Sequence, residues 1–336
     1  MSDFARKVVR WQRLHGRHDL PWQRSRDPYS IWLSEVMLQQ TRVDTVLPYF
    51  ERFLGRFPDV AALARAPLGE VLRLWSGLGY YARARHLHAA ARQIVRACGG
   101  QFPRTVEKLE ELPGIGRSTA GAITALAFGG RAAILDGNVK RVLARSFGVE
   151  GKADQWMLAE KLLPARRIRG YTQGLMDLGA TVCRRENPLC ERCPVAGGCV
   201  ARLEDRVHEL PAPRKAKQIP VRNCVWLVLR YEGRVLLERR PPTGLWGGLW
   251  TFPESHCVVA KSRSRLLGYE IGRVRRGVHF DHVFTHFRLR VQPLFCEVRR
   301  VSPPLRQPRR RWFDIKAAAS AAVPAPVRTL LLEADC

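Results

Sequence analysis

The stretch LPGIGRSTAGAI, residues 112–123, decides how the first half of the chain folds. Gly114 and Gly116 flank one isoleucine between two helix-like runs, so the stretch predicts helix, tight turn, helix. A P-loop would need Gly-Lys-Ser/Thr here, and a dinucleotide-binding turn would need a preceding strand. Because both are missing, we interpret the stretch as a helix–hairpin–helix whose backbone amides hold a DNA phosphate. The alternative is a turn that only packs two helices together.

The charge of the chain points to a polyanionic partner. Its 336 residues contain 57 Lys and Arg against 30 Asp and Glu, a formal net charge of +27. Nucleic acid is the first candidate and an anionic membrane surface the second, while a general drift toward basic composition is the alternative. No apolar run reaches the length of a membrane span. The N-terminal residues lack the apolar core of a signal peptide, which predicts a cytoplasmic protein.

The composition and the hydrophobic pattern of the sequence change after about residue 207. Residues 1–207 show apolar residues at helical spacing, whereas 208–222 are rich in proline and basic residues and predict a linker. Residues 223–336 predict a mixed α and β domain. Within it we expect a hairpin around residues 231–233, one long strand through HVFTHFRLRVQPLFCEVRR, another strand in LRQPRRRWFDI, and a final helix in PAPVRTLLLEA.

Four of the nine cysteines lie close together, with the spacing C-x6-C-x2-C-x5-C: Cys183, Cys190, Cys193 and Cys199. Four thiolates at this spacing suit a tetrahedral zinc ion or an iron–sulfur cluster. Zinc sites commonly use two short Cys pairs, and only one such pair is present. The spacing therefore favours a [4Fe–4S] cluster enclosed by one loop, with zinc as the alternative.

Glu35 is a carboxylate within an otherwise apolar helix. In SIWLSEVMLQQTRV its neighbours on the same helix face include Ile31, Trp32 and Leu38. Partial desolvation beside them would raise its pKa, so that Glu35 could hold a proton at neutral pH and act as a general acid. The alternative is a glutamate at the edge of the apolar stripe that reaches solvent.

Asp136 is the second candidate acid. In ILDGNVKRVLAR it stands just before a helix, where an N-cap is the ordinary interpretation, and Asn138 could serve the same purpose. The functional interpretation is an ionised carboxylate that faces a developing cation. The two acids would then have opposite pKa shifts: the pKa of Glu35 is raised, and Asp136 stays ionised. Such a pair would form a general acid and an electrostatic stabiliser.

These motifs, in this order, resemble the endonuclease III superfamily of DNA glycosylases. SEVMLQQT, WSGLGYYARARHLH, ILDGNVKRVLAR and MDLGA are similar to the MutY-type adenine DNA glycosylases within it. The resemblance runs from about Leu20 to Cys199 and resumes at residues 240–253 and 284–287. It implies an all-α helix–hairpin–helix glycosylase domain with an iron–sulfur cluster loop, followed by an α+β Nudix-like domain. Residues 29–129 would form the helical barrel, and the N-terminal segment with 130–207 would form the cluster subdomain.

The resemblance also implies a reaction. The family flips adenine that is mispaired with 8-oxoguanine or guanine out of double-stranded DNA and hydrolyses its N-glycosidic bond. Glu35 matches the acid that protonates adenine at N7, Asp136 matches the carboxylate that stabilises the oxocarbenium-like sugar, and Asn138 would help to orient it. The cluster would be structural. The protein would act as a monomer, and no membrane would be among its partners.

Further positions match the family's DNA contacts. Ser118, in the helix–hairpin–helix with Gly114 and Gly116, stands where lyase-competent relatives have the lysine that forms a Schiff base. Serine cannot form one, which predicts a monofunctional glycosylase. Four more positions match residues near the two bases: Gln40 and Tyr80 near the oxidised guanine, and Trp22 and Gln173 near the adenine pocket.

The C-terminal domain resembles a Nudix fold without its catalytic box. Glu254 and Glu270 are the only acids between residues 246 and 279, too few for the metal site of a pyrophosphate hydrolase. The domain is therefore expected to bind rather than to cut. Phe284, Thr285 and His286 match the family's 8-oxoguanine-recognition loop, in which serine is usual at the middle position.

Three other functions are alternatives to the adenine glycosylase. An endonuclease III-like glycosylase and lyase acting on oxidised pyrimidines is opposed by Ser118 and by the long C-terminal domain. A non-catalytic iron–sulfur protein that binds DNA or senses redox state is opposed by the presence of both Glu35 and Asp136. A Nudix hydrolase fused to a helical module is opposed by the missing box.

Overall fold

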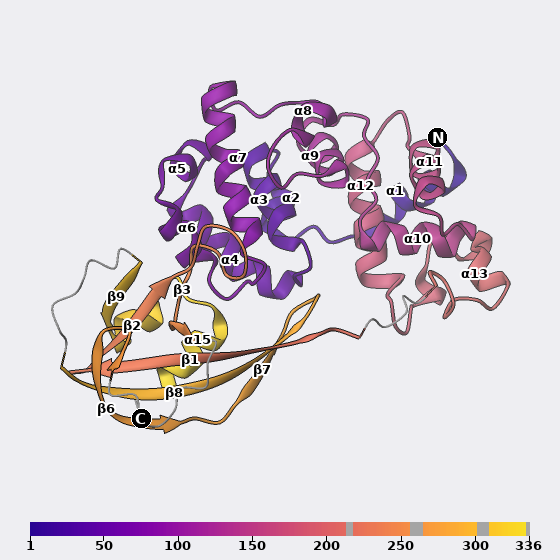
Figure 1. The fold of residues 1–336 in the computed structure, drawn as a ribbon. Helices are drawn as coiled ribbons and strands as arrows, with labels where there is room; N and C mark the ends of the chain where they lie inside the picture. Colours follow the sequence, from indigo (N-terminus) through magenta and orange to yellow (C-terminus); the bar gives the residue numbers. More distant parts are fainter. Residues whose placement is uncertain (213–217, 256–264, 301–308, 334–336) are drawn as a thin grey trace. The chain divides into compact units, whose positions relative to one another are not determined.

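The chain consists of two compact units. The computed structural model describes residues 1–212, 218–255, 265–300 and 309–333 (Figure 1). Unit 1 contains Met1–Arg65 and His86–Lys215, and unit 2 contains Ala66–Arg85 and Ala216–Cys336. The segment Ala66–Arg85 therefore groups with the C-terminal half, although the sequence places it within 1–207. The predicted subdivision of 1–207 and the linker bounds remain predictions.

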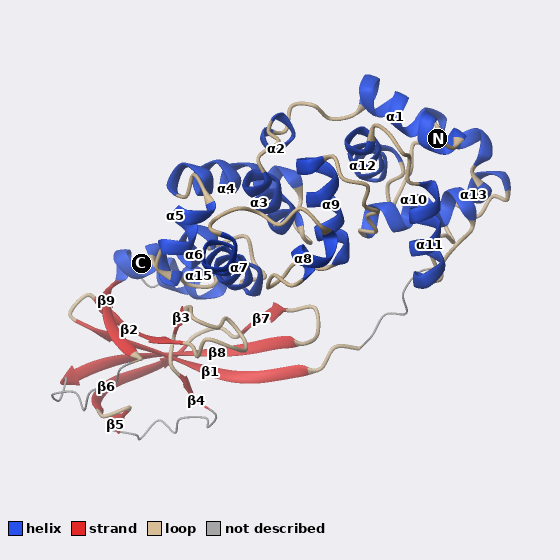
Figure 2. Ribbon diagram, turned by 90° about the horizontal axis from the view of Figure 1, so that it is seen from above, coloured by secondary structure: helices blue, strands red, loops and turns tan. Residues whose placement is uncertain are grey.

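In its described residues, unit 1 is helical throughout, as Figure 2 shows in blue. None of the described helices is long and apolar enough to cross a membrane. The helices are α1 (Asp3–His15), α2 (Pro21–Arg24), α3 (Pro28–Leu38), α4 (Val43–Arg56), α5 (Val60–Arg65), α7 (Ala82–Cys98, whose first residues belong to unit 2), α8 (Val106–Glu110), α9 (Arg117–Phe128), α10 (Gly137–Phe147), α11 (Lys152–Leu162), α12 (Ile168–Asp177), the π-helical turn Leu178–Val182, the 3-10 turns Cys190–Arg192 and Ala196–Gly198, and α13 (Val200–Leu203).

The helix–hairpin–helix predicted from residues 112–123 is present. Helices α8 and α9 are joined by a short turn in which Gly114 has φ +79°, a left-handed conformation that favours glycine. A Cβ at Gly114 would lie 2.6 Å from the Cβ of His86, so a side chain there would also clash. Both the backbone angle and the packing therefore require glycine at this turn.

The core of unit 1 brings four helices to one place. Helix α3 packs on α9, α9 packs on α12, and α10 packs on α12. Buried apolar residues of these helices form one cluster, in which Leu143 of α10 and Tyr171 of α12 are at most 2% exposed. This packing fixes the positions of the first turn of α10 and the middle of α3, where the two candidate acids lie.

Within the described residues, unit 2 is built on a mixed nine-stranded sheet, with a main strand order of β3-β2-β1-β8-β6-β5. The long strands β1 and β8 are parallel and lie side by side (Figure 1), while the other pairs are antiparallel. The elements are α6 (Leu68–Trp75), β1 (Val221–Tyr231), β2 (Arg234–Arg239), β3 (Trp250–Thr251), β4 (Glu254–Ser255), β5 (Arg265–Leu266), β6 (Tyr269–Arg276), β7 (Phe280–Val283), β8 (Arg288–Arg300), β9 (Arg310–Asp314), α14 (Ile315–Ser320) and α15 (Ala325–Glu333).

Most of the predicted elements of unit 2 are confirmed. β1 and β2 form the hairpin, with Glu232 at φ 46° and Gly233 at φ 71° in a two-residue turn. β9 and α15 lie within the segments predicted as a strand and a helix, of which residues 305–308 and 334 lie outside the described part of the chain.

The prediction of one long strand through HVFTHFRLRVQPLFCEVRR was wrong. The chain turns back after β7, and the amide of Phe284 donates to the carbonyl of Phe287 at 2.8 Å before β8 begins. The rings of these two residues stack with centroids 4.7 Å apart. Because the turn contains neither Gly nor Pro and apolar residues continue through it, the period-two pattern could not reveal the reversal.

The segment Ala66–Arg85 is tied to the C-terminal helices by hydrogen bonds. The hydroxyl of Ser76 donates to the carbonyl of Val323 at 2.7 Å, and Nη2 of Arg328 on α15 donates to the Ser76 hydroxyl at 2.9 Å. Nη1 of Arg85 donates to the carbonyl of Gly247 at 3.0 Å. These contacts join residues more than 150 positions apart, which explains the grouping of this segment with unit 2.

Candidate active site

Glu35 lies in the middle of α3, among buried residues. Its neighbours Ile31, Trp32 and Ser34 are at most 2% exposed. Burial raises the pKa of Glu35 from its ordinary value to about 8, and the nearby charge of Asp136 raises it further in the same direction. The predicted desolvation is therefore present, and the carboxyl group holds its proton at neutral pH.

Asp136 is the N-cap of α10. Its side chain accepts a hydrogen bond from the amide of Val139 at 2.7 Å. Burial raises the pKa of Asp136, while the amides of Val139 and Asn138 and the charges of Arg141 and Lys140 act to lower it. The predicted opposite shifts are not found, because burial raises both pKa values. The N-cap hydrogen bonds and the cations favour the ionised form of Asp136, and the charge of Asp136 favours the protonated form of Glu35.

Asn138 lies in the first turn of α10 and packs against the turn that follows α12. Its side-chain oxygen accepts from Nη2 of Arg141 at 2.8 Å, and the same nitrogen donates to the carbonyl of Gly179 at 2.6 Å. A Cβ at Gly179 would lie 2.6 Å from the Cβ of Asn138, so the glycine of MDLGA allows this close approach. Nε of Arg141 also donates to the carbonyl of Cys183 at 2.7 Å, which links Asn138 to the start of the cysteine loop.

A cavity of about 290 Å³ opens beside Glu35. This volume lies near the lower end of the range for small-molecule sites, roughly 300–1,000 Å³. Trp22 and Gln173, predicted for the adenine pocket, line the same cavity as Glu35. The complete lining consists of Gln12, Arg17, His18, Leu20, Trp22, Gln23, Ile31, Ser34, Glu35, Leu38, Val43, Leu126, Arg169, Gly170, Gln173 and Met176.

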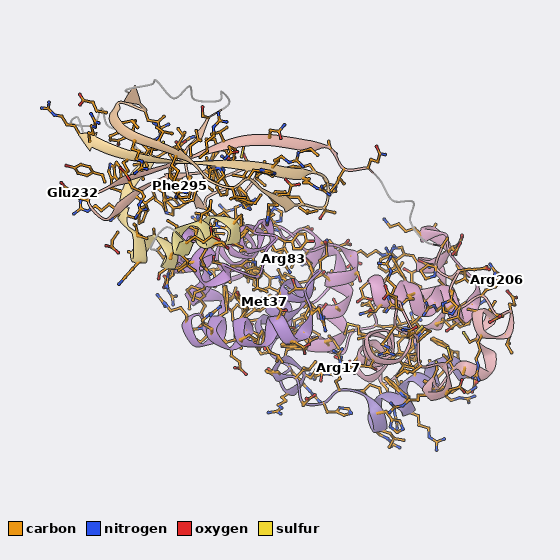
Figure 3. All side chains as sticks on the ribbon, turned by 90° about the horizontal axis from the view of Figure 1, so that it is seen from below. Arg17, Met37, Arg83, Arg206, Glu232 and Phe295 are labelled. Carbon is orange, nitrogen blue, oxygen red and sulfur yellow. The ribbon has the colours of Figure 1, made fainter. Side chains whose placement is uncertain are left out.

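Asp177 holds two side chains that line the cavity, Arg17 and Gln173, and the sequence analysis did not single it out. Its carboxylate is fully buried and forms an ion pair with Arg17 at 2.7 Å, for which Arg17 reaches in from the loop after α1 (Figure 3). Nε2 of Gln173 donates to the same carboxylate at 3.0 Å. This bond fixes the orientation of the Gln173 amide. The Asp in MDLGA, four residues after Gln173 on a helix, was the signal that could have identified it.

The helix–hairpin–helix presents backbone and not side chains. Gly114 and Gly116 are exposed, and Gly116 is the N-cap of α9 with open space where a Cβ would be. Ser118 points the other way: its hydroxyl accepts from the amide of Leu135 at 3.0 Å, one residue before Asp136. The serine therefore contacts the segment that carries a candidate acid, and its contact with DNA remains a prediction.

Two further predicted DNA contacts, Gln40 in unit 1 and Tyr80 in unit 2, share an unusual backbone conformation. They have φ of 57° and 48°, both are exposed, and neither is glycine. Tyr80 is 49% exposed, and the guanidinium of Arg83 lies 5.4 Å from its ring centroid. Nη2 of Arg83 also donates to the carbonyl of Gly79 at 3.3 Å, so the turn that presents Tyr80 is held from within unit 2.

The turn between β7 and β8 carries the predicted 8-oxoguanine loop. Thr285 and His286 are exposed at its tip. Phe284 is half-buried, with its ring centroid 5.4 Å from that of Trp246. Phe284 therefore anchors the turn, and the two polar residues face solvent. In the same unit, Glu254 is paired with Arg240 at 2.8 Å, so this carboxylate is already neutralised.

The four clustered cysteines line one cavity in unit 1, and each of them is a free thiol. Buried Arg145 donates to Sγ of Cys183 at 3.7 Å and to the carbonyl of Arg184 at 2.6 Å. Among the described residues, no three His, Cys, Asp or Glu side chains are arranged to hold a single metal ion. Cysteine thiolates are the ligands that a four-iron cluster takes, so the four side chains present suit such a cluster in type and number.

Comparisons with known proteins place this geometry in a family. Residues 33–165 match the model of the HhH-GPD superfamily of base excision DNA repair proteins, and residues 224–333 match the NUDIX domain. These matches confirm the predicted fold class, a helical glycosylase domain followed by a Nudix-like domain. A thermostable thymine-DNA glycosylase is 32% identical, with a TM-score of 0.56 over 60% of this chain and 95% of that chain. An endonuclease III structure in a non-covalent DNA complex, 21% identical with a TM-score of 0.53, shares the fold.

Curated relatives extend over nearly the whole chain. The adenine DNA glycosylase of Buchnera aphidicola from Acyrthosiphon pisum is 33% identical over 98% of this chain and 96% of its own length. The human adenine DNA glycosylase is 34% identical over 96% of this chain and 72% of its own length. The resemblance seen in the sequence motifs is thereby confirmed, and the chain belongs to the adenine DNA glycosylase family.

Proposed function

We propose that the chain removes adenine mispaired with 8-oxoguanine or guanine in double-stranded DNA, by hydrolysis of the N-glycosidic bond. One observation carries the proposal: a carboxyl group with a pKa of about 8, Glu35, lines a cavity of about 290 Å³ and is influenced by the charge of Asp136. A protonated acid and a neighbouring carboxylate match the needs of a reaction in which the base leaves with a proton and the sugar becomes cationic.

The proposed reaction begins with the adenine flipped out of the duplex and into the cavity. Glu35 donates its proton to N7 of the base. The C1′–N9 bond then breaks, and its electron pair goes to the base while positive charge develops on the sugar. The carboxylate of Asp136 stabilises this charge, with Asn138 helping to orient it. Water adds to C1′ and its proton passes to the Glu35 carboxylate, which restores the acid and leaves an abasic site and free adenine.

The strand should stay intact after the base is removed. A lyase needs an amine that attacks the sugar, and Ser118 has a hydroxyl that accepts a hydrogen bond from Leu135. This favours a monofunctional glycosylase over an endonuclease III-like glycosylase and lyase.

The exposed features of the two units supply the proposed contacts with DNA. Gly114 and Gly116 would hold a phosphate through their amides, and the net charge of +27 would attract the backbone. Gln40 and Tyr80 would wedge near the oxidised guanine. The tip formed by Thr285 and His286 would recognise 8-oxoguanine, with the Thr285 hydroxyl as one hydrogen-bonding group. We propose a monomer that works in the cytoplasm, on the nucleoid.

Cys183, Cys190, Cys193 and Cys199 would hold a [4Fe–4S] cluster, whose role is to pin the loop that Arg145 supports. Purified protein should then be brown with broad visible absorption. A colourless protein containing one zinc ion would contradict the cluster.

A panel of opposite bases tests the proposed function. Single-turnover rates would be measured for adenine opposite 8-oxoguanine, guanine, cytosine and thymine. We expect the first two duplexes to react faster than the others. Equal rates for all four would contradict the mispair preference, and no excision in any duplex would contradict the function itself.

A further inference from the structure

Gln23 has a side-chain amide that the protein itself does not use. The residue lies on α2. Its backbone N–H donates to the carbonyl of Leu20 at 2.9 Å, and its backbone carbonyl accepts from Nη2 of Arg169 at 3.4 Å. The backbone is therefore held. The side-chain atoms Nε2 and Oε1 are both buried, and neither has a hydrogen-bond partner among the described residues.

The position of this amide points to a ligand. Gln23 lines the cavity that also contains Glu35 and Gln173. A buried donor and a buried acceptor without partners are costly, and native proteins rarely keep them without a reason. In a cavity, a bound group that presents an acceptor and a donor side by side would satisfy both atoms.

We propose that Gln23 binds the N1 and N6 edge of the flipped adenine. The side-chain oxygen would accept a hydrogen bond from the N6 amino group, and the side-chain nitrogen would donate to N1. A glutamine amide matches such adjacent groups on adenine in geometry and polarity. The inference rests on the proposed function, in which Glu35 approaches the neighbouring edge of the base at N7.

Two other polar side chains of the cavity are already hydrogen-bonded within the protein. Nε2 of Gln173 donates to Asp177 at 3.0 Å, and the hydroxyl of Ser34 donates to the carbonyl of Ile31 at 2.8 Å. Gln23 is therefore an amide whose donor and acceptor are both available to the base. Removing it leaves N1 and N6 of a buried adenine without these partners, which raises the energy of the bound base.

The test compares substrates that lack one of the two groups. Gln23→Met keeps the length of the side chain and removes its polar atoms. Single-turnover rate constants and half-saturating enzyme concentrations would be measured on duplexes that carry adenine, purine (no N6 amino group) or 1-deazaadenine (no N1). The ratio of variant to unaltered protein on each substrate cancels the intrinsic reactivity of that base.

We expect Gln23→Met to lower excision efficiency on adenine about tenfold. On purine and on 1-deazaadenine, where one of the two hydrogen bonds is already missing, its effect should be clearly smaller. The same fold-loss on all three substrates, or no loss on adenine, would overturn the inference. A purely structural role of Gln23 would produce that uniform loss.

Two further variants keep the test decisive. Gln101→Met, at an exposed glutamine of unit 1, is the matched control and should leave all three ratios unchanged. If Gln23→Met does not fold, Gln23→Glu preserves the size and one acceptor oxygen but removes the donor to N1. The excision efficiency of Gln23→Glu, relative to the unaltered protein, should then fall more on adenine than on 1-deazaadenine. Equal falls on the two substrates would count against the inference. Failure of the unaltered protein to excise adenine would contradict the proposed function instead.

Discussion

At Glu35 and Asp136, burial and neighbouring charge determine which acid keeps its proton. Both pKa values are raised by burial, but only Asp136 has an N-cap amide and nearby cations that favour its charge. The sequence showed the apolar neighbours of Glu35 and the N-cap position of Asp136. It could not show how deeply Asp136 is buried, because that depends on packing between helices far apart in the chain.

The pH dependence of excision follows from these shifts. The single-turnover rate constant should fall as the pH rises through about 8, because Glu35 then loses the proton that it donates. It should also fall on the acid side as Asp136 becomes protonated, at a pH above the ordinary range for aspartate. Rapid-quench assays from pH 4 to 10 would check this, and a rate constant that stays flat through pH 8 would argue against Glu35 as the acid.

The same shift affects stability. The pKa of Glu35 in the folded state, about 8, lies above its ordinary value of 4.5, so the folded protein loses stability as the pH rises between these values. Glu35→Gln removes the ionisation and should raise Tm, by more at pH 8 than at pH 5. Each kcal/mol recovered is worth roughly 2–4 °C in a domain of this size. Calorimetry at pH 5 and pH 8 would measure the change in Tm caused by the substitution. The same change at both pH values would be inconsistent with a raised pKa of Glu35.

At the scale of elements, local patterns with a strong period were predictable and reversals without Gly or Pro were not. The helix–hairpin–helix could be inferred from residues 112–123 because two glycines separate two helical runs. The alternation did not reveal the turn between β7 and β8, because the turn lacks Gly and Pro and Phe287 keeps the phase of Val283 and Leu289; only the resemblance indicated a loop at residues 284–286. The hydrogen bond between the Ser118 hydroxyl and the amide of Leu135 was also not predictable, since the two residues are 17 positions apart in the chain.

Gly114→Ala tests how far the turn depends on glycine. The added Cβ would lie 2.6 Å from the Cβ of His86, at a residue with φ +79°. We expect a loss in the free energy of unfolding on the order of 1–3 kcal/mol, with weaker duplex binding. Gly116→Ala is the matched control for stability, because no atom lies within 4 Å of its added Cβ. Urea denaturation would measure both, and equal stability of the two variants would contradict this account of the turn.

At the scale of the whole molecule, the sequence predicted a helical half followed by a mixed α and β half, and the structure has both. The grouping of Ala66–Arg85 with unit 2 was not predictable. It depends on contacts such as that between Ser76 and Val323, which no local pattern encodes. Helical periodicity identified the helix in this segment but not the core against which it packs.

The net charge of +27 leads to a prediction for the full chain. Affinity for duplex DNA should fall steadily as salt rises, with a linear relation between the logarithms of affinity and salt concentration. Fluorescence anisotropy on a labelled duplex from 50 to 200 mM salt would measure the slope, with the same duplex as its own reference at low salt. An affinity that is independent of salt would mean that the basic residues do not contact phosphates.

The most direct measurement is the release of free adenine from a duplex with adenine opposite 8-oxoguanine, under single-turnover conditions, with the strand analysed before and after alkali. We predict that adenine is released and that the strand breaks at that site only after alkali, while Glu35→Gln and Asp136→Asn lose nearly all release but still bind the duplex. No adenine released by the unaltered protein, or complete strand cleavage without alkali, would contradict the account.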